Sequence, residues 1–423
     1  MIVCMSTPFP LYSQTPKLLR NPLLRSLLRL PHLVRPPRVD MLYQPPLRQE
    51  TAWEWHQRHP ESSNYRLVAP SFRGRLKPCP LDHPEANQHP EWQMTDYEVP
   101  ATFTIEIPYA RVISKRGAVT THDGTLLSDL SREFRRQGAP HSLIAEPPAE
   151  FQKPKRLRGL YALIASHGNC TYHWLFSTLT RIEVLRRAGY DLDQFDGFLA
   201  RKPKFEAHTV LLEKAGVPLE KVRWCTTNSN IEAERLVIPS YPCNETRQNQ
   251  PFVYPFLESL AGNQTISPRL RLYISREDSR LPHRRVVNEK ELVALLQSYG
   301  FMKVTLTGLD VEEQVQLFAS AEVIVAPHGG GLSNLVFTRP PAKVIEIFAP
   351  DYLKLSMRTI CQDKGLTYIP FMGEHVFSSS EAILGQDIRV DIPRFETTLQ
   401  NLLAQPSATH VAQESKTLFS ALA

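Results

Sequence analysis

The residues best suited to chemistry follow an apolar run at residues 323–326 and precede a second run at 344–348. Between the two runs lies the string Pro327-His328-Gly329-Gly330-Gly331-Leu332-Ser333-Asn334. This order predicts a strand, a glycine-rich turn, a short helix and a strand. Consecutive glycines let the backbone approach a ligand closely, and the helix presents unpaired N–H groups and a positive dipole to an anion. The turn is therefore a predicted phosphate or diphosphate site.

Polar side chains around this turn extend the prediction. His328 is expected to donate to phosphate oxygens, and Ser333 and Asn334 add polar contacts. Glu346 ends an otherwise apolar strand, where it is expected to hold the hydroxyls of a ribose. In the competing interpretation the glycines only make a tight turn and His328 caps a carbonyl. A buried, unpaired carboxylate is costly, which favours the ligand. The spacing suits a sugar nucleotide.

A second polar group follows the apolar run at residues 160–165, and it consists of His167, Asn169, His173 and Trp174. In an open α/β sheet, the loop after such a strand faces the ligand cleft. A histidine there can take a proton from an acceptor hydroxyl, as glycosyl transfer by direct displacement requires. His167 and His173 are therefore candidate bases. The alternative is that His173 and Trp174 only pack the first turn of a helix.

Three arginines are predicted near the same cleft. Arg276 follows the strand at residues 270–275, and Arg284 and Arg285 precede Asn288, which opens a helix. Guanidinium groups there would supply forked donors to a diphosphate leaving group and take the place of a metal ion. A solvated basic loop is the alternative for Arg284 and Arg285. We expect no metal site.

Strands and helices alternate in two series, which predicts an α/β fold with two doubly wound halves facing a cleft. The first series has strands at 160–165, 195–199 and 235–238, with helices at 171–188 and 205–215. The second has strands at 270–275, 304–306, 322–326, 344–348 and 366–369, with helices at 288–299, 311–320 and 352–364.

The chain divides into four predicted segments. Residues 1–95 are a Pro/Arg-rich extension with little regular structure. Residues 96–262 form an acceptor-side half with a small β-rich lead-in, residues 263–404 the nucleotide-sugar-binding half, and residues 405–423 a flexible tail. Within the extension, residues 17–34 alternate leucines with basic residues. This pattern fits a helix on an anionic membrane surface, a disordered tail, or a helix packed on its own domain.

Composition limits the possible classes. The 423 residues are 42% hydrophobic, which is ordinary for a soluble protein of two or three domains. The net charge of +6 is concentrated near the start and gives no reason to expect nucleic acid as a partner. The six cysteines lack the spacing of zinc sites or disulfide scaffolds, which favours a reducing compartment. Without an apolar run of about twenty residues, we expect a cytoplasmic protein, with peripheral binding at the inner face of the membrane as an option.

These residues resemble glycosyltransferase family 61. The resemblance covers roughly residues 101–403 and rests on Tyr273-Ile274-Ser275-Arg276, residues 284–292, Gly300-Phe301, residues 326–334 and the block from Asn169 to Trp174. It implies an inverting enzyme of GT-B architecture, with bacterial relatives in capsule or exopolysaccharide assembly. Carried over, it makes Arg276, an arginine at 284 or 285, His328, Ser333 and Glu346 contacts to the nucleotide sugar. Relatives often read His-Gly-Ala-Gly, where this chain has Gly330.

We therefore expect a metal-independent hexosyl- or pentosyltransferase that needs no cofactor. It would move a sugar from a nucleotide-sugar donor, with UDP favoured, to a glycan or lipid-linked saccharide. Three alternatives stay open. One is a nucleotide-sugar sensor or assembly scaffold on the same fold. Another is a metal-dependent GT-A enzyme that uses Asp191 and Asp193, although these residues fit a helix-to-strand connector. The third is an NAD-dependent enzyme, whose glycine spacing this chain lacks.

Overall fold

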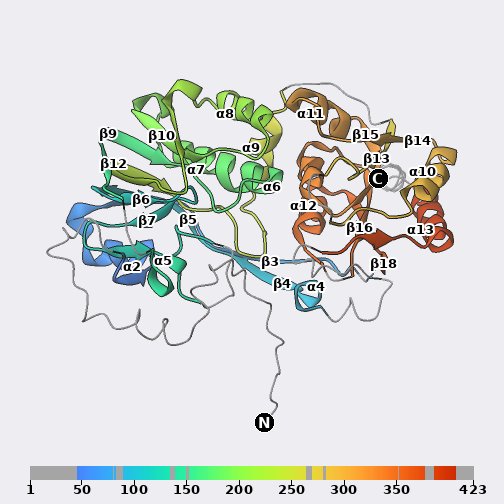
Figure 1. Cartoon of the computed structure of the whole chain (residues 1–423), viewed down its shortest axis with the longest axis horizontal. Coiled ribbons are helices and arrows are strands. Elements are labelled where there is room, and N and C mark those ends of the chain that lie inside the picture. Colours follow the sequence, from blue (N-terminus) through green and yellow to red (C-terminus); the bar gives the residue numbers. More distant parts are fainter. Residues whose placement is uncertain are drawn as a thin grey trace, which may run out of the picture. The chain divides into compact units, whose positions relative to one another are not determined.

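The computed structural model describes residues 45–79, 81, 89–133, 139–148, 152–262, 269–279, 283–350, 352–376 and 385–405 (Figure 1). The described residues belong to one compact unit. The predicted membrane-surface segment at 17–34 and the tail after residue 405 lie outside them. No helix in the described part of the chain combines the length and apolar character that a membrane crossing requires.

The first sheet is mixed, and its parallel part carries the predicted βαβ series. The strands β9 (Lys155–Leu163), β10 (Gly197–Arg201), β11 (Val222–Cys225) and β12 (Asn230–Pro239) lie in the order β11-β10-β9-β12, with all neighbours parallel. The chain reverses its direction across the sheet between β9 and β12. The other strands are β1 (Arg48–Glu50), β2 (Asn64–Ala69), β5 (Thr102–Pro108), β6 (Arg111–Ile113), β7 (Ala118–Thr120) and β8 (Thr125–Leu127).

Helices of the first half confirm the predicted positions. A continuous helix is built from α6 (Thr171–His173), a π-helical turn (Trp174–Leu179) and α7 (Thr180–Arg187). The predicted helix at 205–215 is a 3₁₀ turn (Glu206–Thr209) followed by α8 (Val210–Lys214). The remaining short elements are α5 (Ser142–Ala145), 3₁₀ turns at Leu192–Gln194 and Leu219–Lys221, and α9 (Val253–Ser259).

The second sheet is entirely parallel among the described residues. Its strands are β13 (Leu270–Ile274), β14 (Phe301–Val304), β15 (Ala321–Pro327), β16 (Lys343–Phe348) and β17 (Thr367–Met372), in the order β14-β13-β15-β16-β17. The order reverses between β13 and β15, which makes this pair the topological switch point. Its helices are α10 (Glu289–Ser298), α11 (Val311–Ala319), a 3₁₀ helix (Gly330–Phe337), α12 (Ser356–Lys364) and α13 (Ile392–Ala404), and β18 (Glu374–His375) pairs with β19 (Ile388–Arg389).

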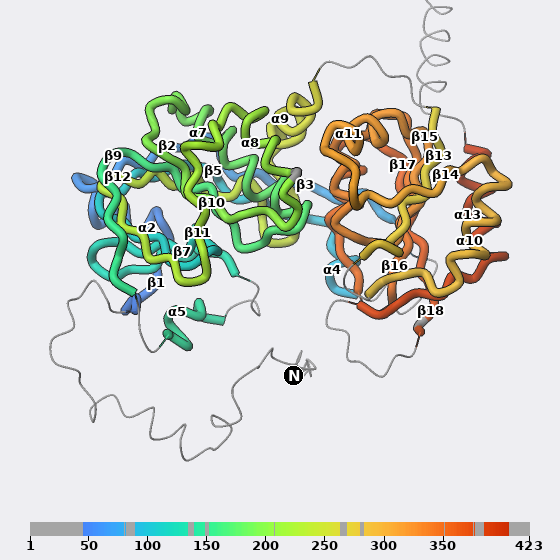
Figure 2. Tube along the Cα trace, turned by 45° about the horizontal axis from the view of Figure 1, so that its top comes forward, coloured from blue at the N-terminus to red at the C-terminus, as the bar shows by residue number. Residues whose placement is uncertain are grey.

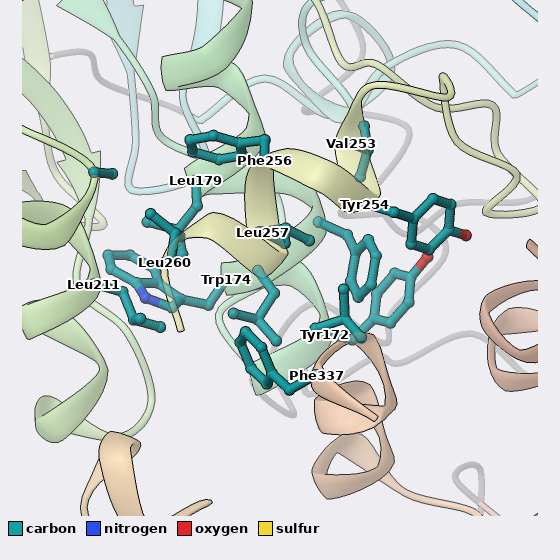
Figure 3. Packing of buried hydrophobic residues seen from close by; sticks show 14 of the residues in the cluster. Tyr172, Trp174, Leu179, Leu211, Val253, Tyr254, Phe256, Leu257, Leu260 and Phe337 are labelled. Atoms are coloured by element: carbon teal, nitrogen blue, oxygen red, sulfur yellow. The ribbon is translucent and has the colours of Figure 1, made fainter. Parts of the chain in front are cut away.

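Alternating side chains give this sheet two apolar faces. Tyr273 packs with the core under α10 and α13, which lie side by side in Figures 1 and 2, whereas Leu272 and Ile274 face the opposite core. That opposite core continues into the first half through α9. Figure 3 shows Tyr172 and Trp174, residues of α9, and Phe337 in one cluster. Apolar packing therefore joins the two halves beside the glycine-rich turn.

The prediction of little regular structure before residue 96 is wrong for the described residues in that range. They form β1, α2 (Ala52–Arg58), a 3₁₀ turn (Pro60–Ser62), β2, β3 (Phe72–Arg75) and α4 (Pro90–Gln93), and β4 (Asp96–Val99) begins there. Proline density suggested loops, yet Thr51 and Glu54 form a capping box at the start of α2. That local signal was available in the sequence.

The described residues between 72 and 99 pack on the second half of the chain, and we call them the β3–β4 segment. The Lys77 amide donates to Gln362 Oε1 at 2.6 Å, and Arg358 Nη2 donates to the Lys77 carbonyl at 2.6 Å. Trp92 lies edge-on to Phe348 at a ring distance of 5.6 Å and shares an apolar cluster with it. The segment therefore supports the second half although in sequence it lies between β2 and β5 of the first sheet.

Replacing Trp92 with alanine is expected to destabilise the protein by about 3–5 kcal/mol, because the indole is 5% exposed and its removal leaves a cavity. The midpoint of thermal unfolding, followed by circular dichroism, measures the loss. Trp53 is 48% exposed, so Trp53→Ala is the matched control and should cost much less. Equal losses in the two variants would contradict the packing role of the β3–β4 segment.

Candidate functional site

One cavity of about 1600 Å³ is lined by residues from both sheets. On the first sheet, its lining residues follow the carboxyl ends of β9 and β12, and others follow β8 and β10. On the second sheet, they follow β13 and β15, and others follow β14 and β16. The strands β9 and β12, and likewise β13 and β15, are the pairs between which the order of each sheet reverses. Such points leave a crevice because the flanking connections run to opposite faces of the sheet.

Most of the predicted site residues line this cavity, and four do not. The lining residues are His167, Asn169, His173, Arg276, Arg284, His328, Gly329, Gly330 and Gly331. Arg285, Ser333, Asn334 and Glu346 lie behind them, so their predicted ligand contacts need correction. Asp191 and Asp193 do not line the cavity. Asp191 instead caps the 3₁₀ turn in the connector between α7 and β10, where its Oδ1 accepts the amide of Asp193. The connector interpretation is confirmed.

Glu346 holds His328 and does not face the cavity. Its side chain is fully buried, and its Oε1 lies 2.5 Å from His328 Nδ1. Tyr368 donates to Oε2 of the same carboxyl at 2.5 Å. Both oxygens are therefore occupied, which leaves none for a ribose. The His328 ring also stacks on Phe348 at 5.4 Å, so Nε2 is the ring nitrogen left for a ligand.

Ser333 and Asn334 lie on the buried side of the 3₁₀ helix. Asn334 Nδ2 donates to Gln314 Oε1 at 2.9 Å, and Gln314 lines the cavity in its place. The Ser333 side chain is fully buried. Arg285 does not line the cavity, and its Nη2 donates to the Ser279 carbonyl at 2.5 Å. Of the two adjacent arginines, Arg284 is the one that reaches the cavity.

Arg276 and Arg284 form a positive wall beside the glycine-rich turn. Neither makes an ion pair with a carboxylate among the described residues, and each has a buried Nε without a hydrogen-bond partner there. The Arg284 guanidinium lies 4.4 Å above the Tyr352 ring. Burial, together with the charge of Arg284, lowers the pKa of Arg276 to about 10, so both groups stay charged at neutral pH. Uncompensated buried charge of this kind favours a bound anion.

The glycine-rich turn is shaped by its neighbours. A Cβ on Gly329 would collide with Nη1 of Arg276, and a Cβ on Gly331 would press on Leu306. A Cβ on Gly330 would meet its nearest atoms only at 4.0 Å, in Thr171. A methyl group at position 329 would therefore displace the Arg276 guanidinium from its present place, whereas position 330 has room for a methyl group.

The two histidines lie together on the side of the first sheet. Their ring centroids are 4.5 Å apart, and His173 Nδ1 is 3.3 Å from Ser177 Oγ. Gly168 lies against the His173 ring, where a Cβ would collide with it. Burial, followed by the charge of Arg247, lowers the pKa of His173 to about 3. Burial also lowers the pKa of His167, so both rings are neutral near pH 7 and able to accept a proton.

Sequence reasoning missed three cavity arginines, namely Arg132, Arg201 and Arg247. Arg201 is the last residue of β10, two residues beyond the end of the predicted strand at 195–199. Residues at the carboxyl ends of parallel strands face the cleft in an open α/β sheet, so this arginine could have been predicted. Arg132 and Arg247 lie in loops beyond β8 and β12, and Arg247 has a left-handed backbone with φ 74°. No local pattern marked these two loops, because their path depends on the assembled sheet.

The buried carboxyl of Glu346 generates a prediction on pH. Burial raises the pKa of Glu346 from its ordinary value to about 8. The folded protein thus keeps a proton that the unfolded chain releases above about pH 4.5. The free energy of unfolding therefore falls as the pH rises from about 4.5 to about 8. Glu346→Gln removes this loss. Thermal unfolding midpoints between pH 5.5 and 8.5 should fall less in Glu346→Gln than in the wild type.

Glu312→Gln is the matched control for this experiment, because the Glu312 side chain is 70% exposed. Its midpoints should follow the wild-type curve. Parallel curves for the wild type and Glu346→Gln would show that the Glu346 carboxyl is ionised in the folded protein throughout this range.

Comparison with known proteins adds a family. Residues 171–345 match the family model described as Glycosyltransferase 61, and no curated protein matches the chain. The matched range runs from the start of α6 into β16 and includes His173, Arg201, Arg276, Arg284 and His328. It therefore spans both walls of the cavity. The match supports glycosyltransferase family 61 for this chain.

Proposed function

We propose that this glycosyltransferase inverts configuration, adopts the GT-B architecture and uses a nucleotide-sugar donor. The acceptor in this proposal is a glycan or a lipid-linked saccharide, and UDP is the favoured nucleotide. The supporting observation is the pair of arginines without carboxylate partners, Arg276 and Arg284, at the glycine-rich turn of a switch point. A candidate base lies in the same cavity.

The donor diphosphate fits the side of the second sheet. Arg276 and Arg284 offer forked donors, His328 offers Nε2, and the 3₁₀ helix that begins at Gly330 has N–H groups without partners inside the helix. Arg247 and Lys354 lie near enough to lower the pKa of His328 further. This concentration of positive charge would stabilise a departing nucleoside diphosphate without requiring a metal ion.

The acceptor hydroxyl fits the side of the first sheet. In the proposed reaction its oxygen attacks the anomeric carbon, the bond from that carbon to the diphosphate oxygen breaks, and the hydroxyl proton moves to His173. Ser177 at Nδ1 orients the ring, as a second group orients the base in many enzymes. The pKa of His173 is low in the free protein, and the negative charge of a bound donor would raise it. His167 is the second candidate base.

The size of the cavity favours transfer over binding alone. Pockets for a single small ligand measure about 300–1,000 Å³, whereas this cavity measures about 1600 Å³. It therefore has room for a donor and part of an acceptor together. A role in capsule or exopolysaccharide assembly, a cytoplasmic location and membrane binding through residues 17–34 complete the proposal and rest on the resemblance and the sequence.

Donor binding is tested by thermal unfolding with a panel of nucleotide sugars and nucleoside diphosphates. A ligand at 100 times its Kd raises the stability of the folded state by about 2.7 kcal/mol, which a shift in the unfolding midpoint detects. Gly329→Ala should lose most of this shift, because its methyl group displaces Arg276. Gly330→Ala adds the same methyl group in open space and should keep the shift. Equal responses would contradict the anion site at the turn.

Catalysis is tested by release of nucleoside diphosphate and formation of glycoside. His173→Ala should lower turnover by roughly 10²–10⁴-fold while the donor-induced thermal shift remains. His122 is exposed and lies outside the cavity, so His122→Ala is the control and should retain activity.

Two outcomes would contradict parts of this proposal. Loss of activity in excess chelator, restored by Mg²⁺ or Mn²⁺, would contradict metal independence. Donor binding without any glycosylated product across neutral and acidic acceptors would favour a nucleotide-sugar sensor or scaffold.

A further inference from the structure

Three arginines line the cavity on the side of the candidate bases, and the proposed reaction gives two of them, Arg132 and Arg201, no role. None of Arg132, Arg201 and Arg247 forms an ion pair with a carboxylate among the described residues. Arg201 donates through Nη1 to the His167 carbonyl and through Nη2 to Asn169 Oδ1 at 3.3 Å. Arg132 donates through Nη2 to the Cys243 carbonyl at 2.7 Å. Each hydrogen-bond partner is neutral, so none of the three charges has a direct ion pair among the described residues, although Asp129 lies near enough to Arg132 for that charge to offset part of the rise that burial causes in the pKa of the Asp129 carboxyl.

The carboxylates that line the same side of the cavity have other partners. Asp129 accepts the Ala52 amide at 2.9 Å, and Glu133 accepts the amide and hydroxyl of Ser142, each at 2.6 Å. Glu206 pairs with Lys202 at 2.9 Å, and Glu245 is exposed. These acids are therefore committed elsewhere or solvated, and the arginines keep unused N–H donors, since a guanidinium has five.

The three arginines lie around the histidine pair, and two of them reach it through a tyrosine ring. The Arg132 guanidinium lies 4.6 Å above the Tyr241 ring, and Tyr241 lies edge-on to His167 at 5.9 Å. Arg247 lies 5.3 Å above the ring of Tyr172, which in turn meets His173 at 5.6 Å. Arg201 contacts His167 through its carbonyl, as described above. A group held by these arginines would therefore lie beside the base.

We propose that the acceptor is anionic, carrying a carboxylate or phosphate close to the hydroxyl that receives the sugar, and that Arg201, Arg132 and Arg247 bind this charge. The inference rests on the proposed glycosyl transfer. An acidic sugar of a glycan and the phosphate of a lipid-linked saccharide share this chemistry. The anion would also offset the positive charge around His173 and so help that ring accept a proton. A neutral acceptor would leave the charges uncompensated.

The donor does not account for this cluster. Its proposed diphosphate contacts are Arg276, Arg284 and His328 of the second half. Among the described residues, the hydrogen bonds of Arg201 and Arg132 go to groups of the first half. Arg247 acts on both His173 and His328, so it lies between the two regions. Arg201 is therefore the residue that best separates acceptor binding from donor binding.

The test compares acceptor probes by isothermal titration, with the donor region saturated by whichever of UDP, GDP or CDP binds. The probes are methyl glucuronide, glucose 1-phosphate and uncharged methyl glucoside at constant ionic strength. A charge-assisted hydrogen bond predicts at least about tenfold tighter binding of one acidic probe than of methyl glucoside. Preference for methyl glucuronide identifies a carboxylate source, and preference for glucose 1-phosphate a phosphate source.

Variants assign the preference to this cluster. Arg201→Gln should abolish it while nucleoside diphosphate affinity stays within about twofold, and Arg201→Lys should restore part of it. The Arg247 side chain makes no hydrogen bond among the described residues, so Arg247→Gln serves as the second variant if Arg201→Gln does not fold. Arg276→Gln is the reciprocal control. It should weaken the binding of the nucleoside diphosphate and keep the preference for the acidic probe, which is measured with the nucleoside diphosphate in excess.

The outcomes separate the two proposals. If no nucleoside diphosphate binds the wild type, the proposed function fails. If one binds and acidic probes bind no better than methyl glucoside, only the anionic acceptor is overturned. An acidic preference that survives in both Arg201→Gln and Arg247→Gln would also overturn the assignment to this cluster.

Discussion

The apolar core shared by the two halves is the constraint on which the site depends. The helix that begins at Thr171, the helix α9 and the 3₁₀ helix after the glycine-rich turn meet in one buried cluster. Because these elements directly follow or flank the switch points of the two sheets, their packing turns two separate sheet edges toward one cavity. The polar chemistry is thus positioned by hydrophobic burial, which is non-directional and large in total.

Within that frame, positive charge is left without carboxylate partners. Structural arginines usually pair with acids or lie in solvent, because an isolated buried charge is costly. Here Arg201, Arg276 and Arg284 instead bind neutral carbonyls or stack on aromatic rings, while the nearby acids accept hydrogen bonds from backbone amides or serine hydroxyls or pair with lysine. Substrate anions would complete the electrostatics of such a cavity. In the proposed reaction, each of the two walls would bind one of two anionic groups.

The supporting residues behind the cavity matter as much as those that line it. Glu346 fixes the Nδ1 edge of His328, Phe348 stacks on the same ring, and Trp92 packs on Phe348. Lys354 at the cavity pairs with Glu91 at 2.5 Å. Residues from near the start of the chain therefore reach the wall that holds the proposed donor. A histidine held by both Glu346 and Phe348 keeps one orientation, which lowers the cost of binding a ligand.

The sequence by itself determined the two βαβ series, the glycine-rich turn and the polar loop after β9, because hydrophobic periodicity and glycine are local signals. It also determined that the arginine after β13 and the histidine after β15 lie at one edge, since the carboxyl ends of parallel strands share it. Only the tertiary structure decided that Arg284 and not Arg285 reaches the cavity, that Glu346 supports His328, and that Arg132 and Arg247 join the histidines. Each of these depends on a loop path or a buried contact between residues distant in the chain, and such contacts leave no local pattern.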